Sequence, residues 1–284
     1  ALNQFPHTLT ASLMFAGAVM VSISAYHLKR KQSVAPMRTS LRFGLWSVIV
    51  GGIGTVVSGD GLGLAMVQTQ PMKMAAAEAL YNTAAPASFS IFTWGTPDGK
   101  SELFSVRIPN LLSFLSTHTL DGEVEGLNDL QSQYVAAYGP GDYMPVIWIT
   151  YWAFRWMIGL GMVSMLIAAV GLFLTRKGNI EIPKWAWNVA IWSAPLPVIG
   201  ISLGWMFTEM GRQPWLVFKL MKTADGVSPG INGVDVLISL IVFTAIYGIL
   251  AVVEMKLLLA AAQQGIDETK ASSEENSEKL AVAY

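Results

Sequence analysis

The sequence predicts an all-α integral membrane protein with about five transmembrane helices and one long external loop. Of its 284 residues, 53% are hydrophobic and 13% are charged, and the mean hydropathy is +0.48. This is too apolar for an ordinary soluble domain. A helix of about 20 apolar residues crosses the hydrocarbon of a bilayer, which offers no partners for unpaired backbone amides. Stretches of that kind lie near residues 8–28, 42–66, 144–174, 185–208 and 234–260.

These stretches divide the chain into four segments. Residues 1–66 hold the first two spans, 67–143 form the external loop, 144–260 hold three further spans, and 261–284 are a polar tail rich in Ser and Glu. The first apolar run has neither a basic leader nor a small-residue cleavage site, so we interpret it as a span and not as a signal peptide.

The distribution of basic residues predicts the orientation in the membrane. The turn after the first span carries Lys29, Arg30, Lys31, Arg38 and Arg42, and the turn after the third carries Arg176, Lys177 and Lys184. Short basic connections remain in the cytoplasm. We therefore expect the loop over 67–143 to lie outside and the tail to lie in the cytoplasm.

Charge and cysteine content exclude several functions. The net charge is −1, so there is no strongly basic face of the kind that binds nucleic acid. The chain has no cysteine, which excludes thiolate zinc sites, iron–sulfur clusters and cysteine-linked haem. His, Met, carboxylates and Lys remain as possible ligands.

Ionisable residues in or against a membrane span are costly and are kept mainly for function or pairing. Here they are His7, Asp60, Arg155, Glu209 and Arg212. His7 opens the first span, and a neutral imidazole is a strong ligand for haem iron. The alternative, which position alone favours, is an interfacial histidine that binds nothing.

Arg155 and Met157 lie in the third span. A His/Met pair is a known axial set for haem, although a single Met in an apolar helix is ordinarily core. Arg155 has no partner in its own helix and could meet a haem propionate. At 3.6 residues per turn the two side chains point about 200° apart, so they cannot both face one neighbour without reaching around the helix.

The end of the fourth span carries Trp205, Glu209 and Arg212 at spacings i, i+4 and i+7, which share a helix face. A carboxylate, a guanidinium and an indole on one face could ligate an iron, hold a propionate and bridge two cofactors. The alternative is a Glu–Arg ion pair that stabilises a helix end.

Lys73 and Glu78 flank an Ala-rich helical stretch outside the second span. Five residues apart, they lie about 140° from each other on an ideal helix, too far around to pair well. The functional interpretation is a quinol pocket in which the carboxylate takes a proton as electrons leave. The alternative is a solvated amphipathic helix.

At these residues the chain resembles subunit I of the cytochrome bd quinol oxidases. Gly211–Trp215 read GRQPW after Trp205 and Glu209, the stretch 59–78 contains GDG, QP, K and AAAE, His7-Thr8 opens a helix, and 151–157 read YWAFRWM. The resemblance covers essentially the whole chain but only the C-terminal half or so of the family's subunit, which has nine spans. The absence of a long insertion after Glu78 is typical of the short Q-loop type.

The resemblance implies a role for each candidate residue. His7 and Met157 would be the axial ligands of a low-spin b-type haem, with Arg155 close to it. Glu209 would ligate a high-spin b-type haem, Arg212 would steady it, and Trp205 would lie between haems and serve electron transfer. Lys73 and Glu78 would serve quinol oxidation in the external loop, which is the family's Q loop, and Asp60 would lie nearby as a supporting acid.

The resemblance also implies a terminal quinol:oxygen oxidoreductase of the bacterial plasma membrane, active as a complex and not as this chain alone. Electrons would pass through two b-type haems towards an oxygen-reducing haem d, whose axial ligand lies outside this chain, and oxygen would become water with charge separation. The implied partners are the second cytochrome bd subunit, the N-terminal half of subunit I, small single-span subunits and membrane lipid. The chain is either a naturally split subunit or a piece of a longer one.

Two other classes of function are alternatives. A transporter could line a solute path with internal Glu and Arg, and Ala194–Pro197 is the one candidate for the broken helix that such proteins use. A haem-free structural membrane subunit is the second alternative. The joint presence of His7, Met157, Glu209 and Arg212 argues against it.

Overall fold

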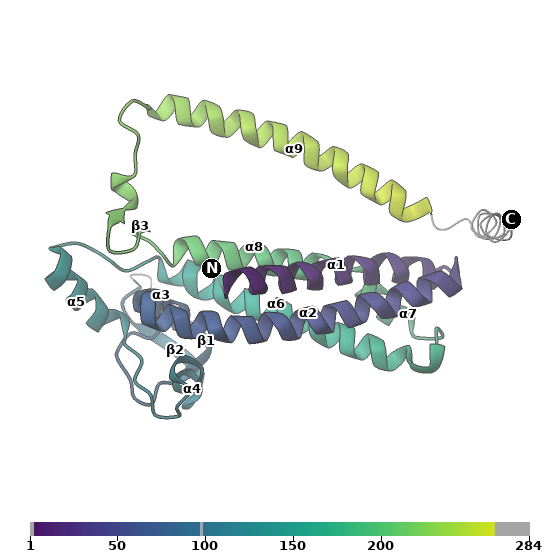
Figure 1. Cartoon of the computed structure of the whole chain (residues 1–284), viewed down its shortest axis with the longest axis horizontal. Coiled ribbons are helices and arrows are strands. Elements are labelled where there is room, and N and C mark those ends of the chain that lie inside the picture. Colours follow the sequence, from purple (N-terminus) through teal and green to yellow (C-terminus); the bar gives the residue numbers. More distant parts are fainter. Residues whose placement is uncertain (1–2, 97–98, 265–284) are drawn as a thin grey trace, which may run out of the picture.

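The structure, a computed structural model, describes residues 3–96 and 99–264 and is predominantly helical. Five helical segments are long and apolar enough to cross a membrane, as predicted. Four of them form an elongated bundle and the fifth stands apart from it (Figure 1). The bundle consists of α1 (Gln4–Lys29), α2 (Val34–Thr69), α6 (Ile147–Leu174) and the pair α7 (Lys184–Ile191) and α8 (Pro195–Met210), and the separate helix is α9 (Gly233–Gln264).

Two boundaries differ from the prediction. Helix α2 begins at Val34 and not near residue 42, because Met37 and Leu41 are buried in the bundle core and extend the helix into the basic turn. The fourth span is divided into α7 and α8 by a break that ends at Pro195, the first residue of α8. Proline fits the first helical position, where its missing N–H is not needed. The break falls at the predicted kink.

Helices α1 and α2 approach closely along most of their length. A Cβ atom on Gly17 would lie 2.8 Å from the carbonyl oxygen of Gly44, and one on Gly51 would lie 2.7 Å from the backbone nitrogen of Met14. No real Cβ atom fits at such distances, so these positions require glycine. Small residues that let backbones touch are the usual means of joining helices in a membrane.

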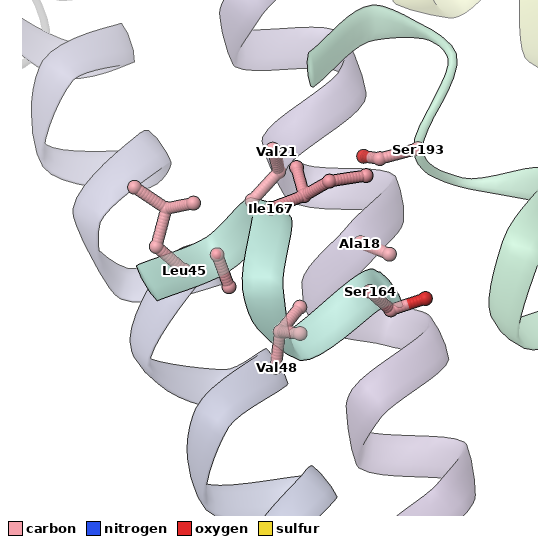
Figure 2. A pocket seen from close by; sticks show the side chains of 8 residues that line it. Ala18, Val21, Leu45, Val48, Ser164, Ile167 and Ser193 are labelled. Carbon is pink, nitrogen blue, oxygen red and sulfur yellow. The ribbon is translucent and has the colours of Figure 1, made fainter. Parts of the chain in front are cut away.

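A small cavity lies where α1, α2 and α6 meet the α7–α8 break. Figure 2 shows the small apolar cavity at this point, with Ala18, Leu45 and Ile167 among its lining residues. Its two polar side chains are satisfied locally, because Ser164 Oγ donates to the Leu160 carbonyl (2.8 Å) and Ser193 Oγ to the Ala190 carbonyl (2.7 Å). The cavity is therefore a packing gap and not a polar site.

The two basic connections lie together at one end of the bundle. Lys29 Nζ donates to Asn188 Oδ1 (2.6 Å), which links the end of α1 to α7. Arg42 Nη1 donates to the Thr175 carbonyl (3.5 Å), which links α2 to the end of α6. The segment between α2 and α6 lies at the opposite end (Figure 1).

That segment is a folded cap on the bundle. Its core joins Met72, Leu127, Tyr134 and Tyr143 to Tyr151 of α6, together with Trp215 from the segment after α8. Two short antiparallel hairpins are the only sheet structure in the described residues, an addition to the all-α prediction. The cap elements are α3 (Pro71–Glu78), β1 (Phe89–Gly95), β2 (Glu102–Ile108), α4 (Leu111–Thr117) and α5 (Leu127–Tyr138), and the second hairpin, after α8, pairs β3 (Trp215–Val217) with β4 (Met221–Lys222).

Helix α9 stands off from the bundle (Figure 1), and no part of its apolar stretch is buried by the described chain. Near its end, His27 Nε2 of α1 donates to the carbonyl oxygen of Ala262 (2.7 Å). The predicted polar tail begins inside this helix, which runs to Gln264, and residues 265–284 lie outside the described residues.

Candidate functional site

A buried ion pair joins the cap to the bundle. Arg155 Nη2 of α6 lies 2.6 Å from Oε2 of Glu78, the last residue of α3, and the two side chains are only 8% and 1% exposed. The backbone N–H of Ser90 donates to the same carboxylate oxygen (3.0 Å). Burial raises the pKa of Glu78, while the Arg155 charge opposes that rise. A buried carboxylate with a shifted pKa beside a specific charge partner is a candidate functional group.

Aromatic rings and hydroxyl groups surround this pair. The guanidinium carbon of Arg155 lies 4.5 Å from the ring centre of Phe89 and 5.0 Å from that of Tyr151. Ser90 Oγ lies 2.8 Å from the Tyr151 hydroxyl and 2.7 Å from Thr93 Oγ1. Sequence reasoning missed Ser90 and Thr93. Their burial follows from strand pairing in the cap, which carries no distinct sequence signal.

The guanidinium of Arg155 has spare donors. Within the described chain its Nε and Nη1 are buried without a hydrogen-bond partner. A buried donor without an acceptor costs about 1–3 kcal/mol, and more when it is charged. A further carboxylate would satisfy these atoms, so the site fits a haem propionate, as the resemblance implies.

Lys73 leaves the opposite side of α3 and meets the end of α8. Its Nζ donates to the Thr208 carbonyl (3.2 Å) and lies 4.8 Å from the ring centre of Phe207. Burial, aided by the Arg212 charge and opposed by that of Glu209, lowers the pKa of Lys73 to about 8. The side chain therefore changes its charge near physiological pH.

The predicted divergence of Lys73 and Glu78 is confirmed, because each contacts a different bundle helix. The alternative of a solvated amphipathic helix is wrong, since every residue from Met72 to Glu78 is buried. The small side chains of Ala75, Ala76 and Ala77 let α3 settle between the bundle and the rest of the cap.

Glu209 and Arg212 form the second carboxylate–guanidinium pair. Helix α8 ends at Met210, so Arg212 lies beyond the helix, yet its Nη2 pairs with Glu209 Oε2. This is the contact that the helix-end alternative predicts. The two side chains are 49% and 31% exposed, and Trp205, one turn earlier, is also exposed. Glu209 and Trp205 thus face away from the described chain, as groups that bind a further component would.

His7 and Met157 lie on different helices. His7 Nδ1 of α1 lies 3.2 Å from Ser58 Oγ of α2. Met157 of α6 points at α8, where a Cβ on Gly204 would lie 2.9 Å from its sulfur. Arg155 and Met157 therefore face different neighbours, as helix geometry predicts. The described residues show no interaction between His7 and Met157, so their joint role as axial ligands stays a prediction.

Asp60 contacts a residue that sequence reasoning did not single out. Its Oδ2 lies 3.3 Å from Nε2 of His118, at the end of α4, and both side chains are exposed. In the part of the chain that the structure describes, no hydrogen bond or ion pair joins Asp60 to Lys73 or Glu78. The expected role of Asp60 as a supporting acid near Lys73 and Glu78 therefore stays a prediction.

Comparison with known proteins places these features in one family. The family model described as cytochrome bd terminal oxidase subunit I matches residues 1–266. The cytochrome bd ubiquinol oxidase subunit 1 of Bacillus subtilis is 35% identical over 267 residues, which cover 93% of this chain and 57% of that protein. The cytochrome bd-II ubiquinol oxidase subunit 1 of Escherichia coli is 28% identical, with coverage of 92% and 62%.

A solved structure agrees with the sequence matches. The bd oxidase of Geobacillus thermodenitrificans superimposes with a TM-score of 0.78 at 27% identity, over 91% of this chain and 57% of that chain. The chain thus spans about three fifths of the length of these relatives. A match over almost every residue, in sequence and in fold, shows that the chain belongs to the cytochrome bd terminal oxidase subunit I family.

Proposed function

We propose that this chain supplies the quinol-oxidising and b-haem-binding part of a bd-type terminal oxidase. The observation that carries the proposal is the buried Glu78–Arg155 pair. It ties the cap helix α3 to α6 two residues from Met157, so the candidate proton acceptor is paired with the helix that carries a candidate haem ligand. Family membership supports a terminal oxidase role.

Glu78 accepts a proton of the quinol as electrons leave it. Its raised pKa favours uptake of that proton, while the positive charge of Arg155 opposes the rise and stabilises the carboxylate form. Lys73, anchored at the end of α8, orients the other side of the ring. The cap excludes bulk water, since α3 is buried along almost its whole length.

His7 and Met157 would hold a low-spin b-type haem, and the spare donors of Arg155 would take a propionate. Glu209 would hold a high-spin b-type haem, Arg212 would steady it, and Trp205 would serve electron transfer between them. Bound haem supplies the one-electron carriers that the side chains of this protein lack. The exposure of Glu209 and Trp205 supports this assignment because it leaves both free to contact another component.

The remaining parts of the oxidase lie outside this chain. They comprise haem d with its axial ligand, where oxygen becomes water, the N-terminal half of subunit I, the second cytochrome bd subunit, and small single-span subunits. Helix α9, whose apolar stretch the described chain leaves exposed, offers a surface for such neighbours or for lipid.

In the bacterial plasma membrane the cap faces outwards and the basic connections face the cytoplasm. The meeting of both basic connections at the end opposite the cap supports this orientation. Quinol protons released outside and cytoplasmic protons consumed at oxygen separate charge across the membrane.

The test is a reduced-minus-oxidised visible spectrum of the purified complex, compared with His7→Ala and Met157→Leu variants. Both variants lose the low-spin b component, while His118→Ala, a matched histidine variant on the outer surface, keeps it. A colourless complex would overturn the proposal and favour a transporter or a haem-free structural subunit. An unchanged spectrum in either ligand variant would remove that residue from the axial set.

A further inference from the structure

The β1–β2 hairpin contacts both the side chain and the backbone of Glu78. Ser90 and Arg107 are cross-strand partners in the hairpin. The backbone N–H of Ser90 donates to the Glu78 carboxylate (3.0 Å), while Arg107 Nη1 donates to the main-chain carbonyl of Glu78 (3.4 Å). One pair of facing residues therefore fixes both the side chain and the backbone of the candidate proton acceptor.

Arg107 also closes the end of α3. Its Nη2 donates to the carbonyl of Ala79 (2.8 Å), and its Nη1 donates to that of Ser88 (3.4 Å). The last carbonyls of a helix have no partner within it and need outside donors. Ala79 adopts φ 45°, a left-handed conformation that is uncommon for alanine. The guanidinium thus stabilises a helix end that does not form at low cost on its own.

The outer side of the same guanidinium is tied to the hairpin. Nη2 of Arg107 lies 2.8 Å from Glu102 Oε2, and Nε donates to Ser105 Oγ (3.3 Å). Arg107 is mostly buried, while Glu102 is exposed. The hydrogen bonds use the planar fork of arginine, and the single ammonium of lysine cannot reproduce them.

We infer that Arg107 is a positioning residue for quinol oxidation, acting through Glu78. It fixes the end of α3 to the hairpin, so the Ser90 N–H and the Arg155 guanidinium meet the Glu78 carboxylate together. Without it the end of α3 separates from β1 and the carboxylate shifts. This inference rests on the proposed role of Glu78, because a residue that acts through Glu78 matters only if Glu78 does.

The test is a double-mutant cycle in the purified complex, with Arg107→Gln, Glu78→Gln and both together, assayed with a short-chain quinol that the parent complex oxidises. Arg107→Gln lowers kcat/KM by about 10- to 100-fold, the range expected for a misplaced catalytic group. Added to Glu78→Gln, it causes no further loss, because residues that act as one unit are not additive. Arg107→Lys does not restore the rate.

Two readouts separate positioning from general damage. The low-spin b band stays close to that of the parent in Arg107→Gln, and Arg176→Gln, at the far end of the bundle, keeps the parent rate. If Arg107→Gln does not assemble, Glu102→Gln loosens the same guanidinium, and it gives a smaller loss that also vanishes in the Glu78→Gln background. Equal factors in both backgrounds, or no loss at all, would overturn the inference.

The same data separate this inference from the proposed function. If Glu78→Gln alone oxidises quinol at the parent rate, the proposed role of Glu78 fails. If Glu78→Gln is impaired but Arg107→Gln and Glu102→Gln are not, only the positioning role of Arg107 fails.

Discussion

The chain contains two carboxylate–guanidinium pairs in contrasting surroundings. The Glu78–Arg155 pair joins the cap to α6 and is almost fully buried, while the Glu209–Arg212 pair lies exposed at the end of α8. Breaking a buried pair leaves an uncompensated charge and costs about 3–5 kcal/mol. An exposed pair contributes only about 0–1 kcal/mol. Glu209 can therefore exchange Arg212 for another partner at little cost, whereas Glu78 is held in place.

The largest expected effect comes from neutralising the buried carboxylate. Glu78→Gln removes the proton acceptor and lowers the rate of quinol oxidation by about 10²- to 10⁴-fold, the usual contribution of a general base. Steady-state assays normalised to haem content measure this. Glu102→Gln, an exposed carboxylate of the same cap, has a much smaller effect. Comparable losses in the two variants would remove the distinction between the buried carboxylate and an exposed one.

Removing the guanidinium of each pair compares their contributions to stability. Arg155→Met leaves Glu78 buried without its partner and lowers the free energy of unfolding by about 3–5 kcal/mol. Arg212→Met, the matched change in the exposed pair, lowers it by less than about 1 kcal/mol. Unfolding by SDS in mixed micelles measures both changes in the free energy of unfolding. Similar losses would show that burial does not distinguish the pairs.

Lys73 lies between the two pairs and gives stability a pH dependence. Its pKa is about 8 in the folded protein, against an ordinary value of 10.5, so between these values the folded state binds fewer protons than the unfolded chain. The penalty for burying the charge is full below pH 8 and disappears as the pH rises towards 10.5. The free energy of unfolding should therefore rise by about 1–3 kcal/mol across this window.

Unfolding measured at several pH values in the parent and in Lys73→Met checks this sign. The rise is absent from the Lys73→Met variant, which has no amine to titrate. Lys219→Met, an exposed lysine beyond α8, keeps the rise of the parent. A parent whose stability falls between pH 8 and pH 10 would contradict the assignment.

The smallest effect is expected at Asp60, where an exposed histidine is the observed partner. Asp60→Asn should change the free energy of unfolding by less than about 1 kcal/mol. It should also leave the KM for quinol nearly unchanged, because in the described residues Asp60 pairs with His118 and makes no hydrogen bond or ion pair with Glu78. A large rise in KM would instead restore Asp60 to the quinol site as the expected supporting acid.

Most of the fold could be predicted from the sequence, because apolar length alone reports a membrane span. The helix break before Pro195 was also predictable, since proline leaves few choices for the preceding chain. The early start of α2 was not, because Met37 and Leu41 lie among basic residues and become buried only against the neighbouring bundle helices. Burial of that kind depends on tertiary contacts and not on local hydropathy.

The candidate site was predicted less completely. Spacing predicted that Lys73 and Glu78 diverge and that Arg155 and Met157 face apart, because both depend only on helix geometry. The partners could not be predicted, since Glu78 and Arg155 are brought together by the packing of α3 on α6. Ser90 and Arg107 look like ordinary polar residues of a loop until strand pairing sets them opposite each other.

The isolation of α9 has a consequence for biogenesis. A helix whose whole apolar surface suits lipid can enter the bilayer before it has any neighbour, because insertion and helix association are separate stages in a membrane. The segment between α8 and α9 keeps the helix connected to the bundle meanwhile. Insertion of α9 therefore need not wait for helix association.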